Sequence, residues 1–247
     1  MDLVAAIPTV RKSVVAIFRY RLVRPETTKK GKVRPAEYKV GWGSGFCIVS
    51  DRYVVTAFHV LNDGESRDPS DRFVAFVVPG NDILAYHFPV TGFPVERPDL
   101  DLAVLEVGQC ATVGIRLPAV PVMSTAQPDG SRVLTVGFPA PEISGLSIDS
   151  QGNYIGGQFF LKSHANEGIL SAQYLLGQLQ MYEFNVGWHH GESGGPVLRL
   201  DDPVAAFTVM QQYRNIESPH GVVAGPHRGC ALSAIRQDIE RLGAQVL

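Results

Sequence analysis

The chain has 247 residues and is 45% hydrophobic, so it is long and apolar enough to bury a sizeable core, and all-β folds of this length are routinely one structural unit. Its formal net charge of −2 gives no argument for a nucleic-acid partner or an anionic membrane surface. No apolar run reaches the roughly 18 residues of a transmembrane helix, and the N-terminal residues lack the basic start and long apolar core of a secretory signal.

Apolar runs separated by turn residues predict six strands in the first half of the chain. These runs span 10–20, 38–49, 53–60, 73–78, 85–90 and 102–107. The polar, basic segment 21–37, which includes the basic run 29–34, is interpreted as a solvated loop or hairpin end. Segment 61–71 is rich in Asn, Asp, Gly, Ser and Pro, which is typical of a loop. The regular spacing of the runs predicts a β-barrel.

The second half again has apolar runs separated by turn residues, after a connector at 114–121 that contains two prolines. Strands are predicted at 132–137, 196–199 and 204–212, and the glycines of region 141–185 predict hairpins whose bounds the pattern does not define. Residues 233–243 have apolar side chains at helical spacing, between a serine that suits a helix start and a glycine that suits its end. The sequence therefore predicts a C-terminal helix there.

The cysteines are Cys47, Cys110 and Cys230, an odd number at long spacing. This pattern indicates neither a disulfide framework nor a metal cluster, so buried small hydrophobes are the expected role of these side chains. A reducing compartment fits this usage. With Met1 as the native start, we expect a cytoplasmic protein that needs no metal and no cofactor.

The sequence Gly-Glu-Ser-Gly-Gly-Pro at 191–196 has the composition of a tight turn around one serine. Gly191 has access to backbone torsions closed to other residues, which would let the amides of Gly191 and Ser193 point into one small space and hold an oxyanion. The alternative is a Gly-rich hairpin with an incidental serine. A serine hydroxyl becomes a nucleophile only beside a base, and that base needs an orienting partner.

A base and its partner are both available in β-rich contexts. His59 ends the run Val-Val-Thr-Ala-Phe-His, and Asp101 opens the run Leu-Ala-Val-Leu at 102–105. The chain order His59, Asp101, Ser193 differs from the orders of subtilisins and of α/β-hydrolases. Three segments carry these residues: GSGFCIVSDRYVVTAFHV (43–60), DLAVLEV (101–107) and GESGGPV (191–197).

These segments resemble the three triad motifs of chymotrypsin-fold, trypsin-like serine proteases, most of all those of the bacterial HtrA-like branch. The resemblance runs from about residue 14 to 242 and is thin between 140 and 185. It implies an all-β fold of two six-stranded antiparallel β-barrels with a C-terminal helix. The first barrel, 1–117, would carry His59 and Asp101, and the second, 118–247, would carry Ser193. No C-terminal PDZ module is expected, because the chain ends soon after its final helix.

The resemblance also implies a serine endopeptidase that works through an acyl-enzyme intermediate. Ser193 would be the nucleophile, His59 the base and Asp101 its orienting partner, with the oxyanion hole formed by Gly191 and Ser193. Asp99 is the rival to Asp101, but the apolar run that follows Asp101 gives the family match.

Glu192 departs from the family pattern. Trypsin-like zymogens usually have Asp at this position, where it receives a freed N-terminal amine, and HtrA-like proteins usually have Asn. No Ile-Val-Gly-Gly start is present, so we expect no trypsin-type activation cleavage. Two hypotheses stay open: Glu192 bonds nearby amides, or a ligand orders the loop.

The specificity pocket is assigned by analogy with the family. Gly187 stands where a trypsin has an acid, so a basic P1 residue is not supported. The predicted walls of the pocket, at 209–211 and 229–230, suit an apolar P1 residue of medium size. His189 and His190 would favour an acidic P1 residue, but solvent-facing loop positions are the preferred interpretation. The predicted substrate-binding residues are Gly187, His190, Val209, Met210, Gln211 and Gly229.

Two functional classes remain. The first is an active endopeptidase acting on proteins or peptides, without a nucleic-acid or membrane partner. The second is a latent trypsin-like regulatory or binding module, which a regulatory partner, a fused domain or cleavage would order. A lipase or esterase is disfavoured because βα alternation is absent. A 3C-like viral protease is disfavoured because the nucleophile is a serine and the aspartate motif is complete.

Overall fold

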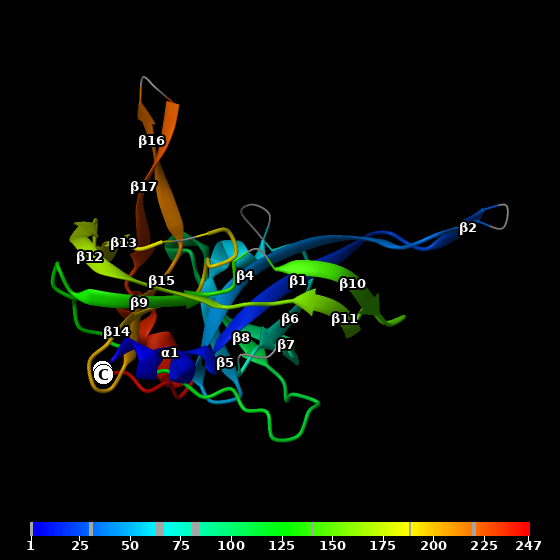
Figure 1. Ribbon diagram of the computed structural model, residues 1–247, viewed down its shortest axis with the longest axis horizontal. Helices are drawn as coiled ribbons and strands as arrows, with labels where there is room; N and C mark the ends of the chain where they lie inside the picture. The colour runs from blue at the N-terminus through cyan, green and yellow to red at the C-terminus, as the bar shows by residue number, and fades with distance from the viewer. Residues whose placement is uncertain are drawn as a thin grey trace.

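Six antiparallel strands of the first half close into a barrel in the order β1-β4-β5-β8-β7-β6 (Figure 1). The computed structural model describes residues 2–29, 32–62, 67–80, 84–139, 141–187, 189–218 and 221–247. The barrel strands are β1 (Val14–Arg24), β4 (Glu37–Val49), β5 (Tyr53–Ala57), β6 (Arg72–Val77), β7 (Tyr86–Arg97) and β8 (Leu102–Val107). The predicted barrel is therefore confirmed.

Both faces of β1 are buried over residues 14–18, which explains why the sequence there is an unbroken apolar run. Val15 and Ile17 point into the barrel core. Their neighbours Ala16 and Phe18 belong to a second core, which also contains side chains from the other half of the chain. Successive side chains of a strand point to opposite faces, so one strand serves both cores.

Segment 21–37, interpreted from the sequence as a solvated loop or hairpin end, forms the far end of a hairpin and extends β1 and β4 into a long arm. The pairing Leu22↔Tyr38 continues the ladder beyond the barrel, and β2 (Thr27–Lys29) pairs with β3 (Lys32–Arg34) farther out. The hairpin interpretation is therefore confirmed, and backbone hydrogen bonds along the ladder pair residues whose polar composition also allowed a loop. Part of the basic run, residues 30 and 31, lies outside the described residues, as do residues 63–66 of the predicted loop 61–71.

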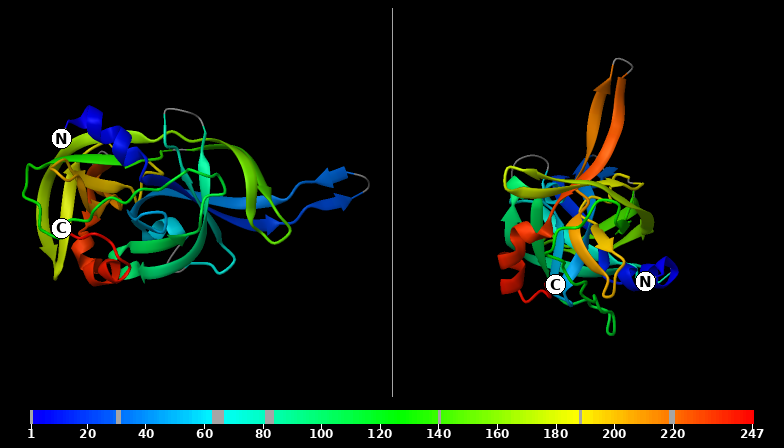
Figure 2. Two further views of the ribbon diagram at one scale, coloured as in Figure 1. Left: turned by 90° about the horizontal axis from the view of Figure 1, so that it is seen from below. Right: turned by 90° about the vertical axis from the view of Figure 1, so that its left-hand side faces the viewer.

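The second half forms a seven-stranded sheet in the order β15-β14-β9-β12-β13-β17-β16. The bridge Thr208↔Ala231 joins β15 to the residue after β17, so this sheet curls toward a second barrel. Its strands are β9 (Arg132–Gly137), β12 (His164–Leu176), β13 (Leu179–Asn185), β14 (Pro196–Arg199), β15 (Ala205–Val209), β16 (Gln212–Ser218) and β17 (Gly221–Cys230). Figure 2 shows the β16–β17 hairpin and the β1–β4 arm projecting in different directions.

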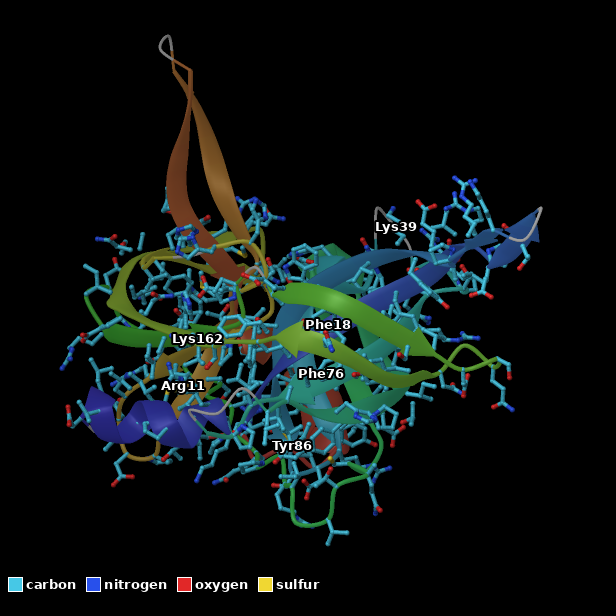
Figure 3. The ribbon with its side chains drawn as sticks, turned by 45° about the vertical axis from the view of Figure 1, so that its right-hand side comes forward. Arg11, Phe18, Lys39, Phe76, Tyr86 and Lys162 are labelled. Carbon is cyan, nitrogen blue, oxygen red and sulfur yellow. The ribbon has the colours of Figure 1, made fainter. Side chains whose placement is uncertain are left out.

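A hairpin within region 141–185 packs against the first barrel. It consists of β10 (Glu142–Ile148) and β11 (Tyr154–Phe160). The ring of Phe159 lies 5.1 Å from Phe18 and 4.8 Å from Phe76, between centroids, and Figure 3 shows the hairpin crossing in front of these two barrel residues. This aromatic cluster fixes one half of the molecule against the other.

Helices occupy both ends of the chain. The helices are α1 (Leu3–Arg11), η1 (Phe58–Leu61), η2 (Pro98–Leu100), η3 (Leu232–Ile235) and α2 (Arg236–Arg241), where η marks a 3₁₀-helix. The predicted C-terminal helix is confirmed as η3 and α2. The predicted first strand was placed too early, because residues 10 and 11 belong to α1. Among the described residues, no helix combines the length and hydrophobicity that spanning a membrane requires.

Candidate active site

The turn around Ser193 takes backbone torsions that require glycine. Gly191 has φ +100° and Gly194 has φ +83°. A Cβ on Gly191 would lie 2.5 Å from the Phe138 carbonyl oxygen, and one on Gly194 would lie 2.2 Å from the Ser44 carbonyl oxygen. Neither position therefore has room for a side chain. Within the described part of the chain, no group accepts a hydrogen bond from the amide of Gly191 or of Ser193.

Ser44, on β4 of the first barrel, holds this turn in place. Its hydroxyl donates to the Gly191 carbonyl at 2.7 Å and accepts from the Phe138 amide at 2.9 Å. Its amide donates to the Ser193 carbonyl at 2.7 Å, and its own carbonyl accepts from the Thr56 hydroxyl at 2.6 Å. The side chain of Ser44 is fully buried, so every bond is shielded from water. Sequence reasoning missed this residue, whose one signal was its place between two glycines.

His59 and Asp101 come from two adjacent strands of the first barrel. His59 lies in η1 directly after β5, and Asp101 lies directly before β8, the strand that pairs with β5. The Nδ1 atom of His59 lies 2.9 Å from Asp101 Oδ2, and the His59 amide donates to Oδ1 at 2.9 Å. The ring therefore faces the carboxylate through Nδ1, which leaves Nε2 unblocked by that contact.

Asp101 has φ +52°, in the left-handed region that Asp tolerates better than most residues. Two groups hold it there. The Phe58 amide donates to the Asp101 carbonyl at 3.1 Å, and Gln211 Nε2 donates to the same carbonyl at 2.7 Å. Gln211 Nε2 also donates to the Leu100 carbonyl at 2.8 Å. Asp99, the rival to Asp101, pairs instead with Arg97 at 2.8 Å.

His59 and Ser193 line one cavity of about 290 Å³ between the two halves of the chain. Its lining consists of Arg19, Gly41, Trp42, His59, Val60, His190, Gly191 and Ser193. No hydrogen bond joins the Ser193 hydroxyl to His59 among the described residues. Such bonds often form only once a substrate is present.

Glu192 lies under the turn with its side chain buried. Its Oε2 accepts from the His189 amide at 2.7 Å, and its Oε1 accepts from Asn166 Nδ2 at 3.2 Å. Burial raises the pKa of this carboxyl, while the His189 amide, the nearby His189 ring and Asn166 act in the opposite direction. Glu192 thus bonds a nearby amide, as the first hypothesis expected, and also a side chain on β12 that the sequence did not single out.

The predicted substrate-binding residues lie in different surroundings. His190 lines the cavity, whereas Gly187 is exposed beside Asn166. The side chains of Val209, Met210 and Gln211 are buried, and a Cβ on Gly229 would lie 2.2 Å from the Val209 carbonyl oxygen. Backbone atoms of Met210 bond Gly194 and Gly195, so this segment supports the serine turn. Contact with a substrate stays a prediction for all six residues.

Two cysteines are poor candidates for a nucleophile. Burial raises the pKa of Cys47 to about 12 and that of Cys230 to about 11, so both thiols are neutral at ordinary pH. In the ranges that the structure describes, no three His, Cys, Asp or Glu side chains are grouped so that they would hold a metal ion. Of the residues that line the cavity, Ser193 alone carries a hydroxyl or a thiol.

The sequence model of the family described as "Trypsin-like peptidase domain" matches residues 43–206, about two thirds of the chain. Comparison with curated proteins finds no matching relative. The family match contains His59, Asp101 and Ser193, and the double-barrel architecture agrees with it. The chain belongs to the trypsin-like peptidase family.

Proposed function

We propose that the chain is a serine endopeptidase in which Ser193 is the nucleophile, His59 the general base and Asp101 its orienting partner. The observation that carries this proposal is that His59, which is paired with Asp101 at 2.9 Å, lines the same cavity as Ser193. The family match supports a peptidase that acts on proteins or peptides. The resemblance of the motifs supports an HtrA-like relationship.

The geometry fits acyl transfer. The Ser193 hydroxyl oxygen attacks the peptide carbonyl carbon while its proton passes to His59 Nε2, and the carbonyl oxygen becomes an oxyanion. The amides of Gly191 and Ser193, which have no acceptor among the described residues, would stabilise that charge. His59 then gives the proton to the leaving amine, the C–N bond breaks, and an acyl-enzyme remains.

Water completes the cycle. His59 takes a proton from a water molecule, whose oxygen attacks the acyl carbon, and the proton returns to Ser193 as the ester bond breaks. Asp101 keeps the Nδ1 proton in place and stabilises the imidazolium, because its carboxylate faces that nitrogen throughout. The first half of the chain thus carries His59 and Asp101, and the second half carries Ser193.

A fluorophosphonate probe tests the proposal, because it reacts with a serine hydroxyl only where a base and an oxyanion hole activate it. We expect the wild-type chain to be labelled, Ser193→Ala not to be labelled, and His59→Ala to react at least about 1,000-fold more slowly. Equal labelling of Ser193→Ala, or no labelling of a folded wild-type chain, would contradict the proposed function.

A further inference from the structure

The carboxyl group of Glu192 is buried within the loop that forms the site. We call residues 189–195 the oxyanion loop. Glu192 exposes 3% of its surface, and each of its two oxygens accepts one hydrogen bond, from the His189 amide and from Asn166 Nδ2. A buried carboxylate is costly unless such donors satisfy it, so the two donors determine where this side chain can lie.

These bonds act directly on the shape of the oxyanion loop. The His189 amide donates to Glu192 Oε2, while the Glu192 amide donates back to the His189 carbonyl at 3.1 Å. The Gly195 amide then donates to the Glu192 carbonyl at 2.9 Å. Gly191, whose amide must point into the cavity, lies inside this closed turn. The direction of its amide therefore depends on where the Glu192 carboxylate is held.

Within the described residues, Asn166 is the one hydrogen-bond donor to the Glu192 carboxylate that comes from outside the loop. It lies on β12, where it pairs with Thr135 of β9, and its carbonyl accepts from the Thr135 hydroxyl at 3.4 Å. Gly137, at the end of β9, lies so close that an added Cβ would be 2.9 Å from the Glu192 Cβ. The paired strands β9 and β12 thus lie directly against Glu192, and the Asn166 side chain on β12 donates a hydrogen bond to its carboxylate.

We propose that Asn166 is a positioning residue that, by hydrogen-bonding Glu192, latches the oxyanion loop in its competent shape. This inference rests on the proposed function. The Asn166–Glu192 pair does the work that a liberated N-terminal amine does in trypsin-type activation. Both oxygens of the Glu192 side chain already accept a hydrogen bond, so the site requires no such amine.

Exchanging the amide and the carboxylate between positions 166 and 192 tests whether the Asn166–Glu192 hydrogen bond holds the oxyanion loop. Asn166→Asp replaces the donor with a second acceptor of the same shape, and we expect fluorophosphonate labelling to slow by about 100-fold or more, the effect of losing an oxyanion donor. The double variant Asn166→Asp with Glu192→Gln restores one carboxylate and one amide with their places exchanged. The new amide at position 192 then donates to the new carboxylate at position 166, while its oxygen accepts from the His189 amide. Labelling should therefore return to within about tenfold of wild type.

Asn185→Asp is the matched control, because it makes the same change at an exposed position on the neighbouring strand β13. All rates are compared at one pH, about 8, because His189 lies beside Glu192 and the rings of His164 and His227 lie near His189. Burial lowers the pKa of His164 and of His227, so these two rings are neutral at that pH. Circular dichroism and the melting temperature show that each variant is folded.

Hydrogen exchange of the oxyanion loop separates failure of the latch from failure of the proposed function. Whether or not the wild type is labelled, we expect the loop amides to exchange faster in Asn166→Asp and at the wild-type rate in the double variant. Unchanged exchange and labelling in Asn166→Asp would overturn the inference, as would a double variant that stays as impaired as the single one. If Asn166→Asp does not fold, Asn166→Ala removes the donor without adding charge and is judged by the same two measurements.

Discussion

At the scale of single residues, the site depends on a strained aspartate that its neighbours hold. Asp101 keeps φ +52°, a conformation that costs about 1–3 kcal/mol in a residue other than glycine. Gln211 offsets this cost by bonding the carbonyls of Leu100 and Asp101, and its own oxygen accepts from the Cys230 amide at 2.6 Å. A buried side chain of the second half therefore positions the acid of the first half.

We predict that Gln211→Glu slows fluorophosphonate labelling at least tenfold. The variant keeps an acceptor for the Cys230 amide but has no donor for the Leu100 and Asp101 carbonyls. Asp101 and His59 therefore lose their alignment, and small displacements of reacting groups lower the reaction rate strongly. The control is Gln212→Glu, the same change at the exposed adjacent position. Equal labelling rates in the two variants would show that Gln211 does not position Asp101.

The raised pKa of Glu192 predicts how the free energy of unfolding depends on pH. Burial is the main cause, so the folded state binds the proton of this carboxyl more tightly than the unfolded state does. The contribution of Glu192 is therefore complete below its unfolded pKa and is lost as pH rises through its folded pKa. The titratable groups near it are His189 and, beyond that ring, His164 and His227.

Urea unfolding of wild type and Glu192→Gln from about pH 4 to about pH 8 measures this contribution. We expect the unfolding free energy of wild type, relative to the variant, to be highest at acid pH and to fall as pH rises. A difference that stays constant or rises with pH would show that the hydrogen bonds from His189 and Asn166 outweigh burial.

The meeting of His59, Asp101 and Ser193 at one site could be predicted from the sequence, because these residues stand in short motifs with local causes, whereas their catalytic roles stay a prediction. The sequence did not predict their supports. Asn166 stands in an ordinary strand, and only the pairing of β12 with β9 brings it to Glu192. Such contacts depend on tertiary structure, which leaves no local pattern in the sequence.

At the scale of elements, β4 connects the first barrel to the serine turn. Ser44 lies on this strand between Gly43 and Gly45, and an added Cβ on Gly43 would lie 3.1 Å from the Ser193 carbonyl oxygen. Small residues therefore let the strand approach the turn closely enough for hydrogen bonds. Most barrel strands could be predicted from their apolar runs. The length of the arm could not, because cross-strand hydrogen bonds determine it, and the end of β5 could not, because the 3₁₀-helix η1 begins there.

We predict that Ser44→Ala destabilises the fold by at least about 2 kcal/mol and also slows labelling of Ser193. The change leaves the Phe138 amide and the Gly191 carbonyl buried without a partner, and each such group costs about 1–3 kcal/mol. Denaturant unfolding and the labelling rate are the measurements. Ser171→Ala, at an exposed strand position, is the control, and a Ser44 variant that matches it in both would refute this role.

At the scale of the whole molecule, the two halves must stay in register because each supplies part of the site. The β10–β11 hairpin contributes to this register through aromatic contacts with the first barrel, including Tyr154 at 5.3 Å from Phe76. The sequence indicated hairpins in region 141–185 but not their packing, since a long-range aromatic contact has no signature in local spacing. The double-barrel class itself was predictable from the motifs and the strand spacing.

We predict that Phe76→Ala lowers the free energy of unfolding by about 3–5 kcal/mol, the usual cost of removing a buried phenyl ring. Phe160→Ala should change the free energy of unfolding by no more than about 0.5 kcal/mol, because that ring, at the end of β11 in the β10–β11 hairpin, is 51% exposed. Chemical denaturation measures both. Similar losses in the two variants would show that the aromatic cluster does not join the halves.

The central claim is that His59 and Asp101 activate Ser193 to form an acyl-enzyme, and trapping that species tests it most directly. The chain is mixed with an activated p-nitrophenyl ester, and intact mass and peptide mapping locate the acyl group. We expect a burst of about one equivalent of nitrophenol, one acyl group on the peptide that contains Ser193, and acylation about 10,000-fold slower in Asp101→Asn. A folded chain that forms no adduct, or one acylated elsewhere, would contradict the account.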